Sequence, residues 1–271
     1  MLSEQRPGWS QTLEFGPTDN HMRALCVAPE EGADWRHINN GDLTEYEKER
    51  LGFYLKELGV FRAYAPFAPA MSARIADPCA LQDELIALPG GIQLYRSHTE
   101  ADGLRLDEPG IAAIFAPGGC GVILAEHVVA HAGRESLIDR QGLCDGVPSR
   151  PHFSIVDAVA ERLRRAGVRI EDTPFHFLFP LPASEFTHPA DEYRAYLRYG
   201  RGLGSLIAWE QEDGIHLDIG RLALAQAREE GFAADRAPRC VLPVWGVHGY
   251  TRHPNEALRT HRNLVIVVRE A

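Results

Sequence analysis

Apolar residues recur along the chain in short runs that are separated by glycine, proline and polar turn residues. A continuous apolar run of roughly four to eight residues is typical of a strand that is buried on both faces. The pattern predicts strands at residues 22–28, 92–97, 111–115, 121–125, 128–130, 175–181, 241–245 and 264–268, and a hairpin from residues 206–209 and 215–217.

Helices are predicted where apolar residues recur at every third or fourth position between a capping residue and a glycine. Thr44 and Glu47 form the pattern of a capping box, and Gly59 follows the last apolar position. The expected helices lie at residues 44–58, 81–88, 154–166, 191–199 and 218–230. Because strands and helices are mixed without a regular βαβ rhythm, the pattern favours a single α/β or mixed α+β domain over a doubly wound sheet.

The stretch of residues 100–140 carries the most reactive side chains. Cys120 lies in a Pro-Gly-Gly turn between two apolar runs, and His131 ends a third run just before an expected helix start. His98 follows the run at 92–97. Ligands of α/β proteins tend to bind at such strand ends. We therefore expect a site around Cys120 and His131.

Three interpretations of these side chains stay open. A thiolate and two imidazoles, from Cys120, His98 and His131, are a known ligand set for Zn²⁺ that leaves one position for water or substrate. Without a metal, Cys120 could act as a nucleophile with His131 as its base. Alternatively, each is a packed residue near a strand end, since 12 histidines bring some of them close to cysteines by chance.

Several arginines could bind an anion near these residues. Arg134 lies at an expected helix N-terminus, where backbone N–H groups attract negative charge. It could equally be a surface residue paired with Glu135 or Asp139. The loop before the last strand is either solvated or folded over the site to hold a phosphate or carboxylate. This loop contains His248, Arg252, His253, Arg259, His261 and Arg262.

Composition narrows the class of partner. The chain has 271 residues and a formal net charge of −10, which argues against binding to nucleic acid or to anionic membrane and favours a small-molecule or protein partner. Its 5 cysteines include no CxxC pair, so a disulfide framework is not expected. The polar N-terminus lacks a signal-peptide pattern and no apolar run is long enough to span a membrane, so we expect a cytoplasmic protein. The sequence does not indicate the oligomeric state.

The central segment ADGLRLDEPGIAAIFAPGGCGVILAEHVVAHAGRESL resembles a known family. It is similar to the central pattern of the laccase-domain proteins, also called multicopper polyphenol oxidoreductases or purine nucleoside phosphorylases of that fold. That pattern is Ala-Asp, a Pro-Gly turn, a strand, Ala-Asp-Cys, a second strand and His-Ala-Gly-Trp-Arg-Gly. Further segments that resemble the family are RSHT, PLPASEFTHPADEYRAY, HLDIGRLALAQAREEGF and GYTRHPNEALRTHRNLVIVV.

The resemblance implies a fold and a site. The fold would be a single-domain layered α/β sandwich, mixed α+β and shared with cysteine deamidases, over residues 1–271 with residues 1–20 as a loosely ordered extension. Zinc would be held by His98, Cys120 and His131, and Arg134 would match the arginine that follows the family's tryptophan. The substrate-pocket motif near the C-terminus would correspond to Tyr250, Arg252 and Arg262. Copper is disfavoured, because one cysteine and two histidines are too few for a multicopper cluster.

The implied activity is phosphorolysis or hydrolytic deamination of purine nucleosides or similar small polar substrates, with phosphate as a second substrate in the first case. The chain departs from the family in having Gly119 before the cysteine and in lacking the tryptophan after Gly133. Two alternatives to a zinc enzyme therefore remain. One is a metal-free Cys-His amide hydrolase or deamidase, and the other is a non-catalytic relative that keeps the fold for binding.

Overall fold

The computed structural model describes residues 10–15, 21–28, 33–67, 73–138, 153–184, 186–189, 197, 208–233, 239–241 and 262–270. Its larger sheet has seven strands in the order β1-β2-β16-β8-β3-β6-β5. They are β1 (Ser10–Glu14), β2 (Met22–Val27), β16 (Leu264–Arg269), β8 (Ile111–Phe115), β3 (Arg62–Phe67), β6 (Ile92–Glu100) and β5 (Glu84–Leu88). β3 runs parallel to both β6 and β8. The carboxyl ends of these three strands therefore lie at one edge of the sheet.

A second sheet has six strands in the order β15-β11-β9-β10-β7-β4. They are β15 (Arg239–Val241), β11 (Phe175–Leu178), β9 (Gly121–Ala125), β10 (Val128–Ala132), β7 (Gly103–Arg105) and β4 (Ile75–Ala76). A small three-stranded sheet consists of β12 (Thr187–His188), β14 (Gly214–Leu217) and β13 (Ala208–Gln211). The expected hairpin is confirmed by the pairing of β13 with β14.

The longer helices begin at the capping residues that the sequence indicates. They are α2 (Glu45–Glu57), α4 (Ile155–Arg165) and α7 (Ile219–Glu230), and single-turn helices occur at α1 (His37–Asn40) and α3 (Arg134–Leu137). Thr44 and Glu47 form the expected capping box, and Ser154 forms another with Asp157. These reciprocal bonds satisfy backbone N–H groups that a helix start otherwise leaves without acceptors.

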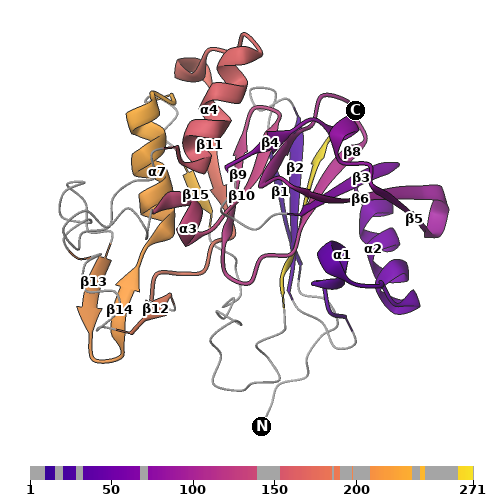
Figure 1. Ribbon diagram of the computed structural model, residues 1–271, viewed down its shortest axis with the longest axis horizontal. Coiled ribbons are helices and arrows are strands. Elements are labelled where there is room, and N and C mark those ends of the chain that lie inside the picture. The colour runs from indigo at the N-terminus through magenta and orange to yellow at the C-terminus, as the bar shows by residue number, and fades with distance from the viewer. Residues whose placement is uncertain are drawn as a thin grey trace.

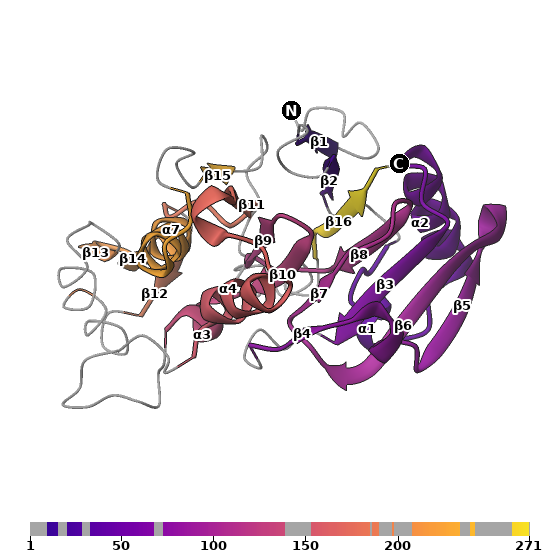
Figure 2. The ribbon, with the colours of Figure 1, turned by 90° about the horizontal axis from the view of Figure 1, so that it is seen from above.

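Three apolar cores divide the molecule into four layers. One core packs α4 and α7 against the six-stranded sheet, a second packs α1 and α2 against the seven-stranded sheet, and a third fills the space between the two sheets. Figure 2 shows α4 and α7 on one side, α2 on the other, and the sheets between them. Alternate residues of β8, β9 and β16 enter different cores, which is why these strands are continuous apolar runs. The mixed α+β layered fold is confirmed.

One expected element is wrong. Residues 81–88 were expected to form a helix, but the structure has a 3₁₀ turn at Pro78–Ala80 and then β5, which pairs antiparallel with β6. Within the expected N-terminal extension, β1 forms a regular antiparallel pair with β2 at the edge of the sheet (Figure 1). Most of the helix expected at 191–199 and of the strand expected at 241–245 lies outside the described residues.

Candidate functional site

The turn that carries Cys120 joins β8 to β9 and is held by two backbone hydrogen bonds. Leu181 N–H donates to the Gly119 carbonyl at 3.0 Å, and Asn263 N–H donates to the Pro117 carbonyl at 3.1 Å. Gly119 has a φ of 152°, a value that favours glycine over residues with a side chain. The aspartate that the family pattern places at this position would therefore be strained in this turn.

His131 is positioned by the antiparallel pairing of β10 with β9, which sets it opposite Val122. Val122 belongs to the core between the two sheets, so the His131 side chain points into the same layer. Its ring lies 6.2 Å from the ring of Phe115, and the residue is 9% exposed. Because α3 begins at Arg134, the expectation that a strand delivers His131 just before a helix is confirmed.

Asp102 supports His131 from the start of β7. Its backbone carbonyl accepts a hydrogen bond from His131 N–H at 2.7 Å. Its carboxylate is fully buried and accepts a hydrogen bond from Ala73 N–H at 2.9 Å. Asp102 had no role in the expected site, although the Ala-Asp pair of the family pattern pointed to it.

Charged residues from α3 and from the segment before β16 act on the Cys120 thiol. Burial is the largest effect and raises the pKa of Cys120 to about 11, and the nearby Glu135 carboxylate also raises it. Arg134 and Arg262 oppose this shift, since their positive charges stabilise a thiolate. The thiol is therefore neutral at pH 7, while two guanidinium groups lie close enough to influence it.

Arg134 is largely buried beside the turn, with 9% of the residue exposed. Its guanidinium contacts the Glu135 carboxylate and lies 3.2 Å from Nδ1 of His188. His188 lies on β12 and is 3% exposed. The sequence carries no local signal for this contact, because β12 comes from a distant segment of the chain.

Arg262 reaches the same turn from the segment before β16. A Cβ atom on Gly118 would lie 3.1 Å from its Nε, so the two residues are in close contact. Burial lowers the pKa of Arg262 and the positive charge of Arg36 lowers it further, whereas Asp34 acts in the opposite direction. Arg36 donates to the Asp34 carboxylate at 2.8 Å. We call Cys120, His131, Arg134 and Arg262 the Cys120 site.

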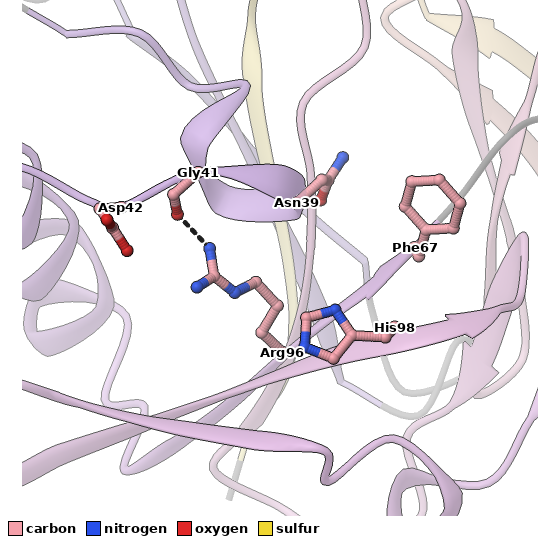
Figure 3. Close-up of a pocket in the computed structure, with 6 residues that line it drawn as sticks. All are labelled: Asn39, Gly41, Asp42, Phe67, Arg96 and His98. Carbon is pink, nitrogen blue, oxygen red and sulfur yellow. Dashed lines mark hydrogen bonds between the residues drawn. The ribbon is translucent and has the colours of Figure 1, made fainter.

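His98 does not join this site. Its side chain is 70% exposed, and β6 is separated from β8 by β3 in the sheet. His98 lies beside Asn39 of α1 and the two residues that follow this helix, Gly41 and Asp42 (Figure 3), whereas His131 faces the core between the sheets. The sheet therefore separates the two imidazoles, although β6 and β8 end at the same edge.

The three expected zinc ligands are not brought together in the described part of the structure. The described part of the chain contains His98, Cys120 and His131, and no group of three or more His, Cys, Asp or Glu side chains within it could hold a metal ion. These residues do not fit a three-ligand zinc centre. Tyr250 and Arg252, the other expected pocket residues, lie outside the described residues.

The described helices include none with the length and apolarity that a membrane crossing requires. No family model matches the chain, and no curated protein does. Solved structures do match over almost the whole chain.

Three solved structures resemble the fold. YlmD from Geobacillus stearothermophilus matches with a TM-score of 0.61 and 15% identity, covering 99% of this chain and 98% of that one. YfiH from Bacillus licheniformis matches with a TM-score of 0.58 and 12% identity, over 97% of each chain. Neisseria meningitidis protein NMB0706 gives a TM-score of 0.53 and 13% identity, over 98% of this chain and 100% of that one. These are laccase-domain proteins, so the fold expected from the central motif is confirmed: this chain has the laccase-domain fold.

Proposed function

We propose that this chain is an enzyme that acts on a purine nucleoside or a similar small polar substrate, with phosphate bound at the Cys120 site. The observation that carries the proposal is the position of Arg262. Burial and Arg36 both disfavour its positive charge, so a bound anion would offset both effects. Arg134 approaches the same turn from α3, and two guanidinium groups suit the oxygens of a phosphate.

The reaction that fits these groups best is phosphorolysis. A phosphate oxygen forms a bond to the sugar C1′ atom, the C1′–N bond to the base breaks, and the base leaves with the bonding electrons and takes up a proton. Arg134 and Arg262 would hold the phosphate and orient its attacking oxygen. His131, buried beside the turn, would supply or accept the proton. No step requires ionisation of Cys120, whose raised pKa disfavours a resting thiolate.

Zinc remains a prediction of the family resemblance. The described residues do not assemble the expected ligands, and the reaction above uses none. The raised pKa of Cys120 likewise does not favour the metal-free Cys-His hydrolase, which needs a thiolate at neutral pH.

The test is turnover of inosine, adenosine and guanosine by the purified protein, with and without phosphate, measured as release of free base and sugar 1-phosphate. We expect Arg262→Gln to lower kcat/KM for phosphate by roughly 100-fold or more, because a charged contact to the reacting anion is lost. Arg262→Lys should recover part of the rate, since it keeps the charge but not the forked donors.

Arg169→Gln is the matched control, because Arg169 is 77% exposed on a distant turn. It should leave turnover unchanged. If the release of base does not depend on phosphate, the reaction is hydrolysis and not phosphorolysis. No release of base or ammonia by the folded protein would instead identify a non-catalytic binding relative.

A further inference from the structure

His188 reaches the Cys120 site from the small three-stranded sheet. It lies on β12, 54 residues along the chain from Arg134, and its Nδ1 atom is 3.2 Å from Nη1 of that arginine. A guanidinium group carries only hydrogen-bond donors, so Arg134 donates and His188 accepts. The imidazole is therefore neutral, with its proton on Nε2. His188 thus presents an acceptor to one of the cations of the site.

The position of His188 is fixed by close packing within its sheet. β12 pairs antiparallel with β14, which sets His188 opposite Ile215. A Cβ atom on Gly214 would collide with the His188 carbonyl oxygen, so this approach of the two strands requires glycine. The ring of Phe186 packs edge-on against the imidazole, with 4.7 Å between the ring centroids. The imidazole is therefore held in its orientation toward Arg134.

Two acceptors from different segments hold the Arg134 guanidinium. Its Nη1 atom donates to His188, and its Nη2 atom donates to the Glu135 carboxylate. Glu135 follows Arg134 directly in the single-turn helix α3, so the two side chains can move together. His188 supplies a contact from outside this helix. It therefore fixes where the guanidinium lies relative to the rest of the molecule.

The guanidinium held in this way acts on the turn that carries Cys120. Its positive charge lowers the pKa of the thiol, whereas the Glu135 carboxylate raises it. The ionisation of Cys120 therefore reports where the charge of Arg134 lies. An arginine side chain that is already ordered also loses less conformational entropy when an anion binds, so the anion binds more tightly.

We propose that His188 is a positioning residue for the phosphate site: its neutral imidazole accepts a hydrogen bond from Arg134 and holds that guanidinium at the Cys120 turn. The proposal rests on the function proposed above, since phosphate is the anion that Arg134 would bind. His188 acts on the substrate only through Arg134. The small three-stranded sheet thereby takes part in substrate binding.

Two substitutions of His188 separate its acceptor from its shape. His188→Phe keeps a flat ring beside Phe186 but removes the acceptor, whereas the Oδ1 atom of His188→Asn lies near the position of the imidazole Nδ1. We expect His188→Phe to raise KM for phosphate roughly tenfold and to change kcat less than about twofold, because Arg134 is misplaced while the reacting groups remain. His188→Asn should recover most of the affinity. Calorimetric titration with inorganic phosphate measures the same affinity without turnover.

Alkylation of Cys120 reports the position of Arg134 independently of phosphate. If His188→Phe lets the guanidinium move away, the thiolate loses a stabilising charge. Iodoacetamide should then label Cys120 about threefold more slowly at pH 9. His188→Asn should be labelled at a rate close to that of the wild type.

His216→Phe is the matched control in the same sheet. His216 is 2% exposed and pairs with Thr187, so it lies on the opposite face of the sheet from His188. Its ring nitrogens contact the Ala183 carbonyl and the Asp213 carboxylate. The substitution should lower Tm and leave both the phosphate KM and the labelling of the thiol unchanged.

The positioning role is overturned if His188→Phe leaves phosphate affinity and Cys120 labelling unchanged, or if His216→Phe has the same effects. It is also overturned if His188→Asn recovers neither property. In each of these cases, a loss of phosphate binding in Arg262→Gln would leave the phosphate site itself standing. Wild-type protein that binds no phosphate would overturn both proposals.

Discussion

Cys120 lies in a turn where burial and Glu135 both oppose ionisation of the thiol, with a pKa of about 11 as the result. Alkylation by iodoacetamide requires the thiolate. At pH 7 we expect Cys120 to react much more slowly than the exposed Cys79, with a rate that rises roughly tenfold per pH unit toward pH 11. Glu135→Gln removes a negative charge that raises the pKa, so it should accelerate the reaction. Peptide mass spectrometry measures both rates.

A labelling rate at Cys120 that levels off below pH 8 would contradict this expectation. It would show that the site stabilises a thiolate. The metal-free Cys-His hydrolase would then become the favoured function. Cys26 provides an internal reference, because it is fully buried and burial raises its pKa to about 12. It should remain unlabelled in the folded protein.

The residues of the Cys120 site were predictable to different degrees. Cys120 and His131 sit at strand ends that the apolar runs predict, and local sequence therefore indicates their position. Arg262 was expected through the family motif, and its contact with Gly118 agrees with that placement. His98 lies apart from Cys120 and His131 in the described structure, because its position depends on how β6 packs beneath α1, which the strand's own sequence does not show.

At the scale of elements, Glu47 connects α2 to the loop that leads into α1. It is 1% exposed, and its carboxylate accepts hydrogen bonds from Thr44 N–H at 2.8 Å and from Asp34 N–H at 2.7 Å. His37 Nδ1 lies 3.1 Å from the same carboxylate. Glu47→Ala should therefore lower the free energy of unfolding by about 3 kcal/mol, because several buried donors lose their acceptor. Urea denaturation measures the change.

The exposed Glu49 on the same helix is the matched control. Glu49→Ala should change the free energy of unfolding by less than about 0.5 kcal/mol. Equal effects of the two substitutions would mean that Glu47 acts only through helix propensity. In that case the loop before α1 would not depend on its carboxylate.

Capping explains why some elements were predictable and β5 was not. Thr44, Ser154 and Asp218 mark helix starts by short-range bonds that the sequence displays directly. Residues 81–88 contain good helix formers, and yet Glu84–Leu88 form a strand. Among the described strands, β5 lies at the sheet edge and pairs with β6 alone, and Leu85 on it is 55% exposed. Pairing with β6, the next strand along the chain, therefore overrides the local preference of these residues for a helix, and the apolar pattern of residues 81–88 does not show it.

At the scale of the whole molecule, the core between the two sheets couples the outer helix layers. Leu55 on α2 is fully buried in the core that faces the seven-stranded sheet, and α4 packs on the six-stranded sheet. Residues of β8, β9 and β16 contribute to the core between the sheets as well as to an outer one. The seven-stranded and the six-stranded sheet each contribute to two cores, so a loss of packing at Leu55 should also destabilise the core around α4. We therefore expect the chain to unfold as one cooperative unit.

Leu55→Ala should lower the free energy of unfolding by about 2 to 5 kcal/mol. If unfolding is cooperative, amide protection in α4 should fall by the same amount as in α2, although Leu55 belongs to a different core. Hydrogen exchange read by mass spectrometry measures both helices in one sample. Phe53→Ala on the same helix is the control, because Phe53 is 52% exposed and its loss should affect neither helix strongly. Protection that falls in α2 but is retained in α4 would show two halves that unfold independently. The single domain expected from the mixed order of strands and helices would then have to be divided between the two sheets.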